Sequence, residues 1–298
     1  MKNPSNIAAS IRQRLLNKAR QDQRPFAELL QYYAMERFLY RLSQSPHNQR
    51  FILKGALMLR VWQAPETRPT MDIDMLGITD NDSTAILAQI TEVLGIAVND
   101  DGMAFDTTSL QAETITQEAD YQGVRVRFTG TLDKAIVRLQ LDIGFGDLVH
   151  PTAEWAYFPT LLKFPEPELL CYSRESAIAE KFEAMVKLGV LNSRMKDFYD
   201  IWLLARLYNF KAQELGLAIE KTFKQRGTAQ LDRWSFGQTF IANKQVQWLA
   251  FHKRLHQPHV PIQFAEIMAF LEQFLLPVTQ PAAIQTNAIW IAPGAWHN

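Results

Sequence analysis

The strongest constraint on the fold of this 298-residue chain is a short alternating segment, Met71-Asp72-Ile73-Asp74-Met75. Side chains alternate between the two faces of a β-strand, so the apolar residues share one face and the aspartates the other. Two like charges one pleat repeat apart repel each other unless a cation lies close to them. The segment therefore predicts a strand with one face in the core and the other facing a cation.

The residues just before this strand supply the other parts of a phosphate site. Gly55 lets the backbone come close to a ligand, and Lys54 and Arg68 are cations. Together with Asp72 and Asp74 they predict a site for a metal ion and a triphosphate.

A third carboxylate comes from a later alternating segment. Residues 124–128 and 136–143 both alternate cleanly and predict strands, and Gln140 and Asp142 lie on the polar face of the second one. If this strand neighbours that of Asp72 and Asp74, Asp142 joins their face. Three converging carboxylates can hold two divalent cations, with substrate phosphates and water completing each coordination shell.

The remaining patterns predict helices around a small mixed sheet, an α/β (α+β) fold. Residues 5–43 read as two helices, the second opened by Pro25, and residues 84–94 as a third, capped by Asp82 or Ser83. Arg37 and Arg41 are expected to be solvated, with phosphate contact as the alternative. Prolines between positions 151 and 167 place the boundary between a catalytic domain, 1–165, and a mainly helical domain, 166–298, that completes the active-site cleft.

The helical domain adds three candidate site residues. Helical spacing places Lys181 at the edge of an apolar face, from which it can reach inward, whereas Glu183 points away from that face. Asp197 and Asp200 share one flank of the next helix. Either aspartate can belong to the site, and pairing with Arg194 or Lys196 is the alternative.

Charge is unevenly distributed along a chain whose net charge is zero. Residues 1–60 carry 11 Lys/Arg and 3 Asp/Glu, whereas residues 71–124 carry 11 Asp/Glu and no Lys or Arg. A basic block beside an acidic one can steer a polyanion towards a metal-loaded centre, although a solvated helix face explains it equally well. The single Cys171, the lack of a signal-like N-terminus and the absence of a long apolar run predict a cytoplasmic protein away from membranes.

Three sequence blocks resemble the AbiEii/AbiGii toxin family, which includes the MenT toxins of type IV toxin–antitoxin systems. They are KGALML…RPTMDIDM, ESAIAEKFEAM and RMKDFYDIWLL, and the resemblance covers roughly residues 5–205. Where many nucleotidyltransferases have Gly-Ser or Gly-Gly, this chain has Gly55-Ala56, and alanine has no hydroxyl to bind a phosphate.

The resemblance implies a Mg²⁺-dependent enzyme that transfers a nucleoside monophosphate from an NTP to an acceptor, with the 3′ end of tRNA as the expected one. It also implies growth arrest or abortive infection of phage-infected cells, and a cognate antitoxin. Modification of a protein side chain and a non-catalytic binding role remain alternatives. The implied metal ligands are Asp72, Asp74 and Asp142, and the implied catalytic set adds Lys181, Asp197 and Asp200. The implied nucleotide-binding residues are Lys54, Gly55, Ala56, Arg68, Thr70 and Lys181.

Overall fold

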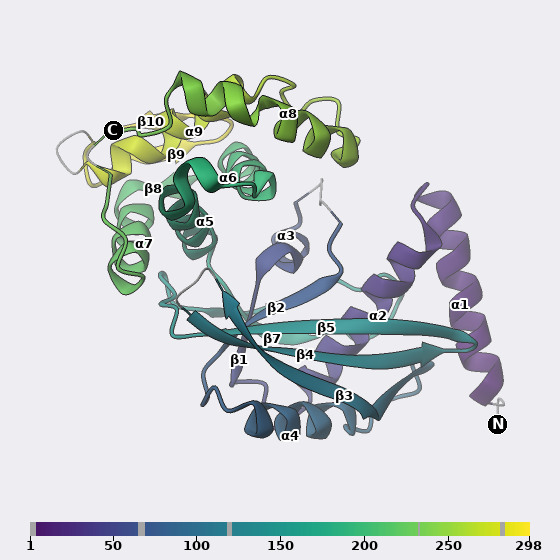
Figure 1. Cartoon of the computed structure of the whole chain (residues 1–298). Helices are drawn as coiled ribbons and strands as arrows, with labels where there is room; N and C mark the ends of the chain where they lie inside the picture. Colours follow the sequence, from purple (N-terminus) through teal and green to yellow (C-terminus); the bar gives the residue numbers. More distant parts are fainter. Residues whose placement is uncertain (1–3, 65–68, 118–120, 232, 281–283) are drawn as a thin grey trace. The chain divides into compact units, whose positions relative to one another are not determined.

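The computed structural model describes residues 4–64, 69–117, 121–231, 233–280 and 284–298 (Figure 1). The chain divides into two compact units. The first comprises Met1–Gly146 and Ala153–Tyr172, and the second comprises Asp147–Thr152 and Ser173–Asn298.

A seven-stranded mixed sheet forms the centre of the first unit, with the strand order β3-β4-β5-β2-β1-β7-β6. The pairs β2·β5 and β1·β7 are parallel and the other neighbours antiparallel. The strands are β1 (Phe51–Lys54), β2 (Asp72–Gly77), β3 (Met103–Gln117), β4 (Tyr121–Leu132), β5 (Ala135–Phe145), β6 (Glu154–Tyr157) and β7 (Glu168–Cys171). The expected mixed α/β fold class is confirmed.

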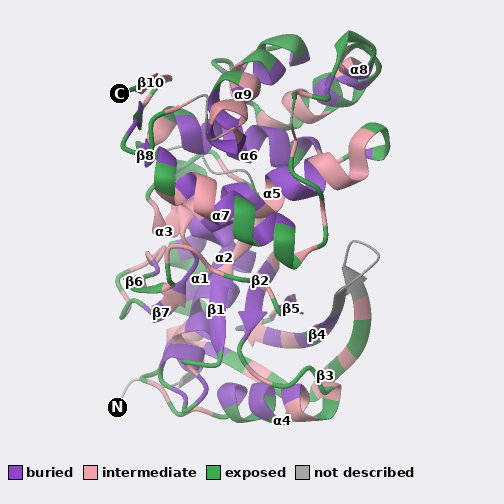
Figure 2. Cartoon of the chain, turned by 90° about the vertical axis from the view of Figure 1, so that its left-hand side faces the viewer, coloured by how far each residue is buried: buried purple, intermediate pink, exposed green. Residues whose placement is uncertain are grey.

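The sheet is larger than the small one predicted from the sequence. The strand β3 escaped prediction because its register with β4 shifts between Asp106 and Gln111, and this irregularity breaks the alternation of apolar and polar residues. β6 and β7 have only four residues each. Figure 2 shows β1 buried along most of its length, whereas much of β3, at the sheet edge, is exposed or half-buried.

Helices cover the apolar face of this sheet. Phe38 of α2 packs against Phe128 of β4 with ring centroids 5.2 Å apart, and α4 contacts β3, β4 and α2. Asp82 caps α4 by accepting a hydrogen bond from the Ala85 amide, one of the two predicted caps. The helical segments are α1 (Pro4–Gln21), α2 (Phe26–Ser43), the 3₁₀ turn η1 (Gly55–Leu57), α3 (Met58–Val61) and α4 (Ser83–Leu94).

Two arginines of α2 that were expected to be solvated are buried instead. Arg41 forms a bidentate ion pair with Asp101, with nitrogen–oxygen distances of 2.8 and 3.1 Å. Arg37 donates to the Pro165 carbonyl and lies 3.2 Å from a Glu36 carboxylate oxygen. The prediction was wrong because Asp101 and the Pro165 carbonyl, which bind these two cations, are distant from them in sequence.

Glu36 ties the connection between β6 and β7 to α2. Its carboxylate is fully buried and accepts a hydrogen bond of 2.8 Å from the Leu161 amide. Burial raises the pKa of Glu36 to about 7, although the neighbouring Arg37 lowers it. The buried carboxylate therefore takes up a proton close to neutral pH.

The second unit is mainly helical, as expected. Its helical segments are α5 (Arg174–Leu188), the 3₁₀ turn η2 (Gly189–Leu191), α6 (Met195–Leu207), α7 (Ala212–Gln225), α8 (Gln238–Leu255) and α9 (Phe264–Thr279). A three-stranded sheet in the order β10-β9-β8 joins β8 (Phe210–Lys211), β9 (Ile289–Ile291) and β10 (Ala295–His297). The fully buried Trp290 anchors this sheet by donating to the Ala205 carbonyl of α6.

Across the part of the chain that the structure describes, every helix is too short or too polar to span a bilayer.

The buried Glu36 predicts a pH-dependent stability. Its pKa in the folded protein is about 7, above the ordinary value of 4.5, so the folded state binds more protons than the unfolded state between these values. The free energy of unfolding should fall by about 3 kcal/mol as pH rises from 4.5 to above 7. Glu36→Gln should flatten this decline in denaturant titrations across that range. The matched change at exposed Glu154 should leave the slope unaltered, and an unchanged slope in Glu36→Gln would contradict the assignment.

Candidate active site

A row of five charged residues crosses the polar face of the large sheet. Cross-strand register aligns Glu113 of β3 with Arg125 of β4, Arg125 with Asp142 of β5, Asp142 with Asp74 of β2, and Asp74 with Lys54 of β1. Neighbouring strands lie about 4.8 Å apart, and residues in register share a face. The two central carboxylates are therefore flanked by a cation on each side. This charge row is the candidate active site of the first unit.

Asp72 lies on the same face, one pleat repeat from Asp74 and in register with Gln140. Thr70 precedes it, and its hydroxyl lies 3.4–3.5 Å from the backbone of Asp72. The Thr70 amide donates to the Tyr32 hydroxyl of α2, which fixes the entry to β2. Arg68, a predicted phosphate ligand, lies outside the described residues.

Gly55 brings the backbone against the Asp74 carboxylate. Its φ is +73°, in the region that favours glycine, and a Cβ there would lie 2.0 Å from Asp74 Oδ2. Lys54 precedes it, with its ammonium 5.3 Å from the ring centre of Tyr172. The Ala56 side chain is buried in the core. The Gly55 backbone therefore lies against the Asp74 carboxylate, and its approach to a bound ligand stays a prediction.

Asp142 is bound by an arginine that the sequence had not singled out. Arg125 Nε and Nη2 donate to Asp142 Oδ1 and Oδ2, both at 2.7 Å, and Gln140 donates to Oδ2 at 3.3 Å. The hydrogen bond to Asp142 raises the pKa of Arg125 above its ordinary value. Arg125 stood in the alternating segment 124–128, but only the register of β4 and β5 shows that it meets Asp142.

Asp72 and Asp74 fit a divalent cation better than Asp142 does. Mg²⁺ is commonly held by one or two carboxylates together with substrate phosphates, and Asp72 and Asp74 lie on one face of β2. Within the described ranges, no group of three His, Cys, Asp or Glu side chains is arranged to hold a metal. Both oxygens of Asp142 are already bound by Arg125, so Asp142 is less available as a third ligand.

The three candidates in the second unit form their own ionic cluster. Lys181 Nζ lies 3.0 Å from Asp200 Oδ2 and 3.6 Å from Asp197 Oδ1. Arg194 Nε lies 2.7 Å from Asp197 Oδ2, so the pairing considered as an alternative is present. The side chains of Asp197 and Asp200 are 0% and 2% exposed. Both aspartates are thus buried with compensating cations.

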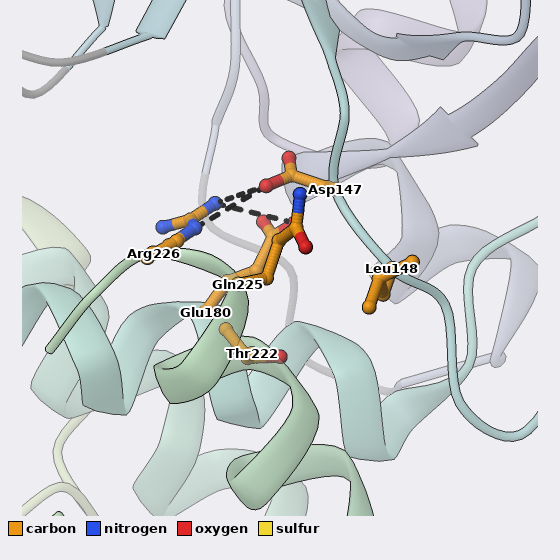
Figure 3. Close-up of a pocket in the computed structure, with 6 residues that line it drawn as sticks. All are labelled: Asp147, Leu148, Glu180, Thr222, Gln225 and Arg226. Atoms are coloured by element: carbon orange, nitrogen blue, oxygen red, sulfur yellow. Dashed lines mark hydrogen bonds and ion pairs between the residues drawn. The ribbon is translucent and has the colours of Figure 1, made fainter. Parts of the chain in front are cut away.

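A second ionic cluster of this unit is centred on Arg226 and lines a narrow pocket (Figure 3). The guanidinium binds Asp147 at 2.9 Å and Glu183 at 3.0 Å, and lies 3.5 Å from Glu180. Although burial lowers it, the carboxylates of Glu180 and Asp147 raise the pKa of Arg226 above its ordinary value. Glu183 was expected to point away from the apolar face, but it is fully buried because Arg226 and Thr228 satisfy its oxygens.

The close approach at Gly55 predicts an effect of adding one methyl group. Gly55→Ala should destabilise the protein by about 3 kcal/mol. Alanine is strained at this positive φ, and its Cβ would also clash with the Asp74 side chain. Gly146→Ala is the matched control: its φ is +81°, but a Cβ there would meet nothing within 4 Å. That variant should lose only about 1 kcal/mol in denaturant unfolding. Equal losses would show that Asp74 is not in contact with this backbone.

The lysine cluster predicts a difference between two lysines of α5. Lys181→Ala should lower the free energy of unfolding by about 3 kcal/mol, because two buried carboxylates lose a cation. Lys187→Ala, in the last turn of the same helix, should cost below about 1 kcal/mol. Adding Asp200→Asn to Lys181→Ala should restore part of the lost stability. Additive losses in this double-mutant cycle would exclude the coupling.

Comparison with known proteins identifies the family of this chain. Two structures from Helicobacter pylori are similar, each at 15% identity and over 83% of this chain: JHP933 (TM-score 0.48, 90% of that chain) and a candidate nucleotidyltransferase (TM-score 0.47, 93%). No curated protein matches this sequence. Residues 37–286 match the nucleotidyl transferase AbiEii toxin of type IV toxin–antitoxin systems. The chain therefore belongs to the AbiEii family of nucleotidyltransferase toxins.

Proposed function

We propose that this protein transfers a nucleoside monophosphate from an NTP to a hydroxyl group of RNA, at the 3′ end of tRNA. The observation that carries the proposal is the placement of Asp72 and Asp74 on one sheet face, with the Gly55 backbone against Asp74 and Lys54 on the next strand. A carboxylate pair beside a glycine backbone and a lysine suits a metal-bound triphosphate.

The reaction is a displacement at the α-phosphorus. The acceptor oxygen forms a bond to the α-phosphorus, the bond from that phosphorus to the bridging oxygen of the β-phosphate breaks, and pyrophosphate leaves. Mg²⁺ bound by Asp72 and Asp74 would supply charge neutralisation at the phosphates. Lys54 neutralises further triphosphate charge. Asp142 takes the proton of the acceptor hydroxyl.

RNA as the acceptor is supported by the charge of the first helix. Helix α1 carries Arg12, Arg14, Lys18 and Arg20 and no acidic residue within its bounds. The three arginines are exposed, whereas Lys18 is paired with Asp22 at 3.0 Å. Exposed arginines without neighbouring acids suit sequence-independent contacts with phosphates.

Membership of a toxin–antitoxin family implies an antitoxin partner. The proposed consequence of tRNA modification is growth arrest in the cytoplasm, which can also limit phage replication. The antitoxin would then control either the transfer or the synthesis of this protein.

A labelling experiment tests the proposal and its rivals together. The purified protein is incubated with each α-labelled NTP, Mg²⁺, total tRNA and total protein, and the products are separated. We expect label on tRNA from the wild type and a loss of at least about 100-fold in Asp72→Asn and Asp74→Asn. Asp80→Asn, an exposed aspartate beyond the same strand, should retain transfer.

Each alternative outcome has its own meaning. Label on protein would replace RNA by a protein side chain as the acceptor. Absence of transfer with every NTP would favour a non-catalytic binding role. Normal transfer by Asp74→Asn would show that the carboxylate pair is not the catalytic centre.

A further inference from the structure

The Asp142 carboxylate already has a cation in the structure, although the sequence predicted it as a metal ligand and the proposed function gives it the proton of the acceptor hydroxyl. Both of its oxygens accept hydrogen bonds of 2.7 Å from Arg125, and its side chain is only 10% exposed. A guanidinium fork and a divalent cation compete for the same carboxylate oxygens. A cation therefore binds Asp142 less readily while Arg125 stays in place.

Arg125 has a second acidic neighbour on its other side. Glu113 of β3 is in register with Arg125, and its Oε1 lies 3.9 Å from Arg125 Nη1. The Glu113 side chain is 47% exposed and also binds Arg127 Nη2 at 2.9 Å. The guanidinium thus lies between a buried carboxylate that it binds at 2.7 Å and an exposed one that is 3.9 Å away.

The balance between these partners depends on the charge at the centre of the row. Without a divalent cation, Asp74 and Asp142 are like charges in register on adjacent strands, and Arg125 offsets their repulsion. A divalent cation on these carboxylates would offset it instead and would repel Arg125. The Arg125 guanidinium is therefore favourable beside Asp142 when the site holds no divalent cation, and unfavourable there when a cation is bound.

We propose that Arg125 is a positioning residue that holds Asp142 until a divalent cation binds, and then transfers its ion pair to Glu113. The inference rests on the proposed function, because it takes the divalent cation of that function as the ligand. The exchange of partners by Arg125 makes Asp142 available as a metal ligand and proton acceptor only when the divalent cation is bound.

The exchange predicts effects of opposite sign at two residues in contact. Arg125→Gln removes the competitor of the cation, so Mn²⁺ should bind about tenfold more tightly. Glu113→Gln removes the partner that receives Arg125, so Mn²⁺ should bind about threefold more weakly. Arg127→Gln is the matched control, because it also loses one positive charge beside Glu113 but leaves the Arg125–Asp142 fork in place.

The experiment titrates the full-length protein and the three variants with Mn²⁺ alone and measures free Mn²⁺ by electron paramagnetic resonance. Thermal unfolding in a chelator is the second measurement, and Arg125→Gln should melt lower than Arg127→Gln there, with Mn²⁺ closing most of the gap. If Arg125→Gln does not fold, the weaker binding of Glu113→Gln, a change at an exposed side chain, still decides the question.

Two results overturn the exchange while leaving the proposed function intact. One is equal Mn²⁺ affinity of Arg125→Gln and Arg127→Gln, and the other is unchanged or tighter binding by Glu113→Gln, each with RNA labelling retained. Wild-type protein that binds no Mn²⁺, and whose binding curve matches that of Asp74→Asn, would overturn the metal site as well as the exchange.

Discussion

Repulsion between carboxylates on adjacent strands is the constraint around which the first unit is organised. Asp74 and Asp142 are in register on the parallel pair β2·β5, and Asp72 lies one pleat repeat away. Lys54 and Arg125 occupy the flanking strands in the same register, so each outer neighbour of the acidic pair is a cation. The sheet can hold this charge density only because its strand order places β1 and β4 on either side of that pair.

The same solution, an acid held by cations from distant parts of the chain, recurs away from the sheet. Arg41 binds Asp101 before β3, and Arg226 lies within 3.5 Å of three carboxylates in the second unit. Because these groups are buried, losing one partner leaves an uncompensated charge, which costs far more than an exposed pair would. Such ties fix loops whose sequences contain little secondary-structure signal.

Much of the fold followed from local patterns. The alternation in β2, β4 and β5 and the helical spacing in α1, α2 and α4 predicted those elements, because one buried face imposes a period on the sequence. Prediction failed at β3, where a register shift interrupts the alternation, and at β6 and β7, which are too short to show a period. It also placed Met71 on the apolar face, whereas that side chain lies before β2 and is 55% exposed.

The sequence by itself determined which residues carry the acidic charge of the candidate site, because Asp72, Asp74 and Asp142 stand at alternate positions of strands with an apolar opposite face. It also determined the glycine that the backbone needs beside them. Only the tertiary structure decided which cation pairs with each buried carboxylate. Arg125 reaches Asp142 through strand register, and Lys181 reaches Asp200 in the second unit through the packing of α5 on α6. The physical reason is that periodicity fixes the face on which a side chain lies, whereas its partner depends on which strand or helix packs alongside.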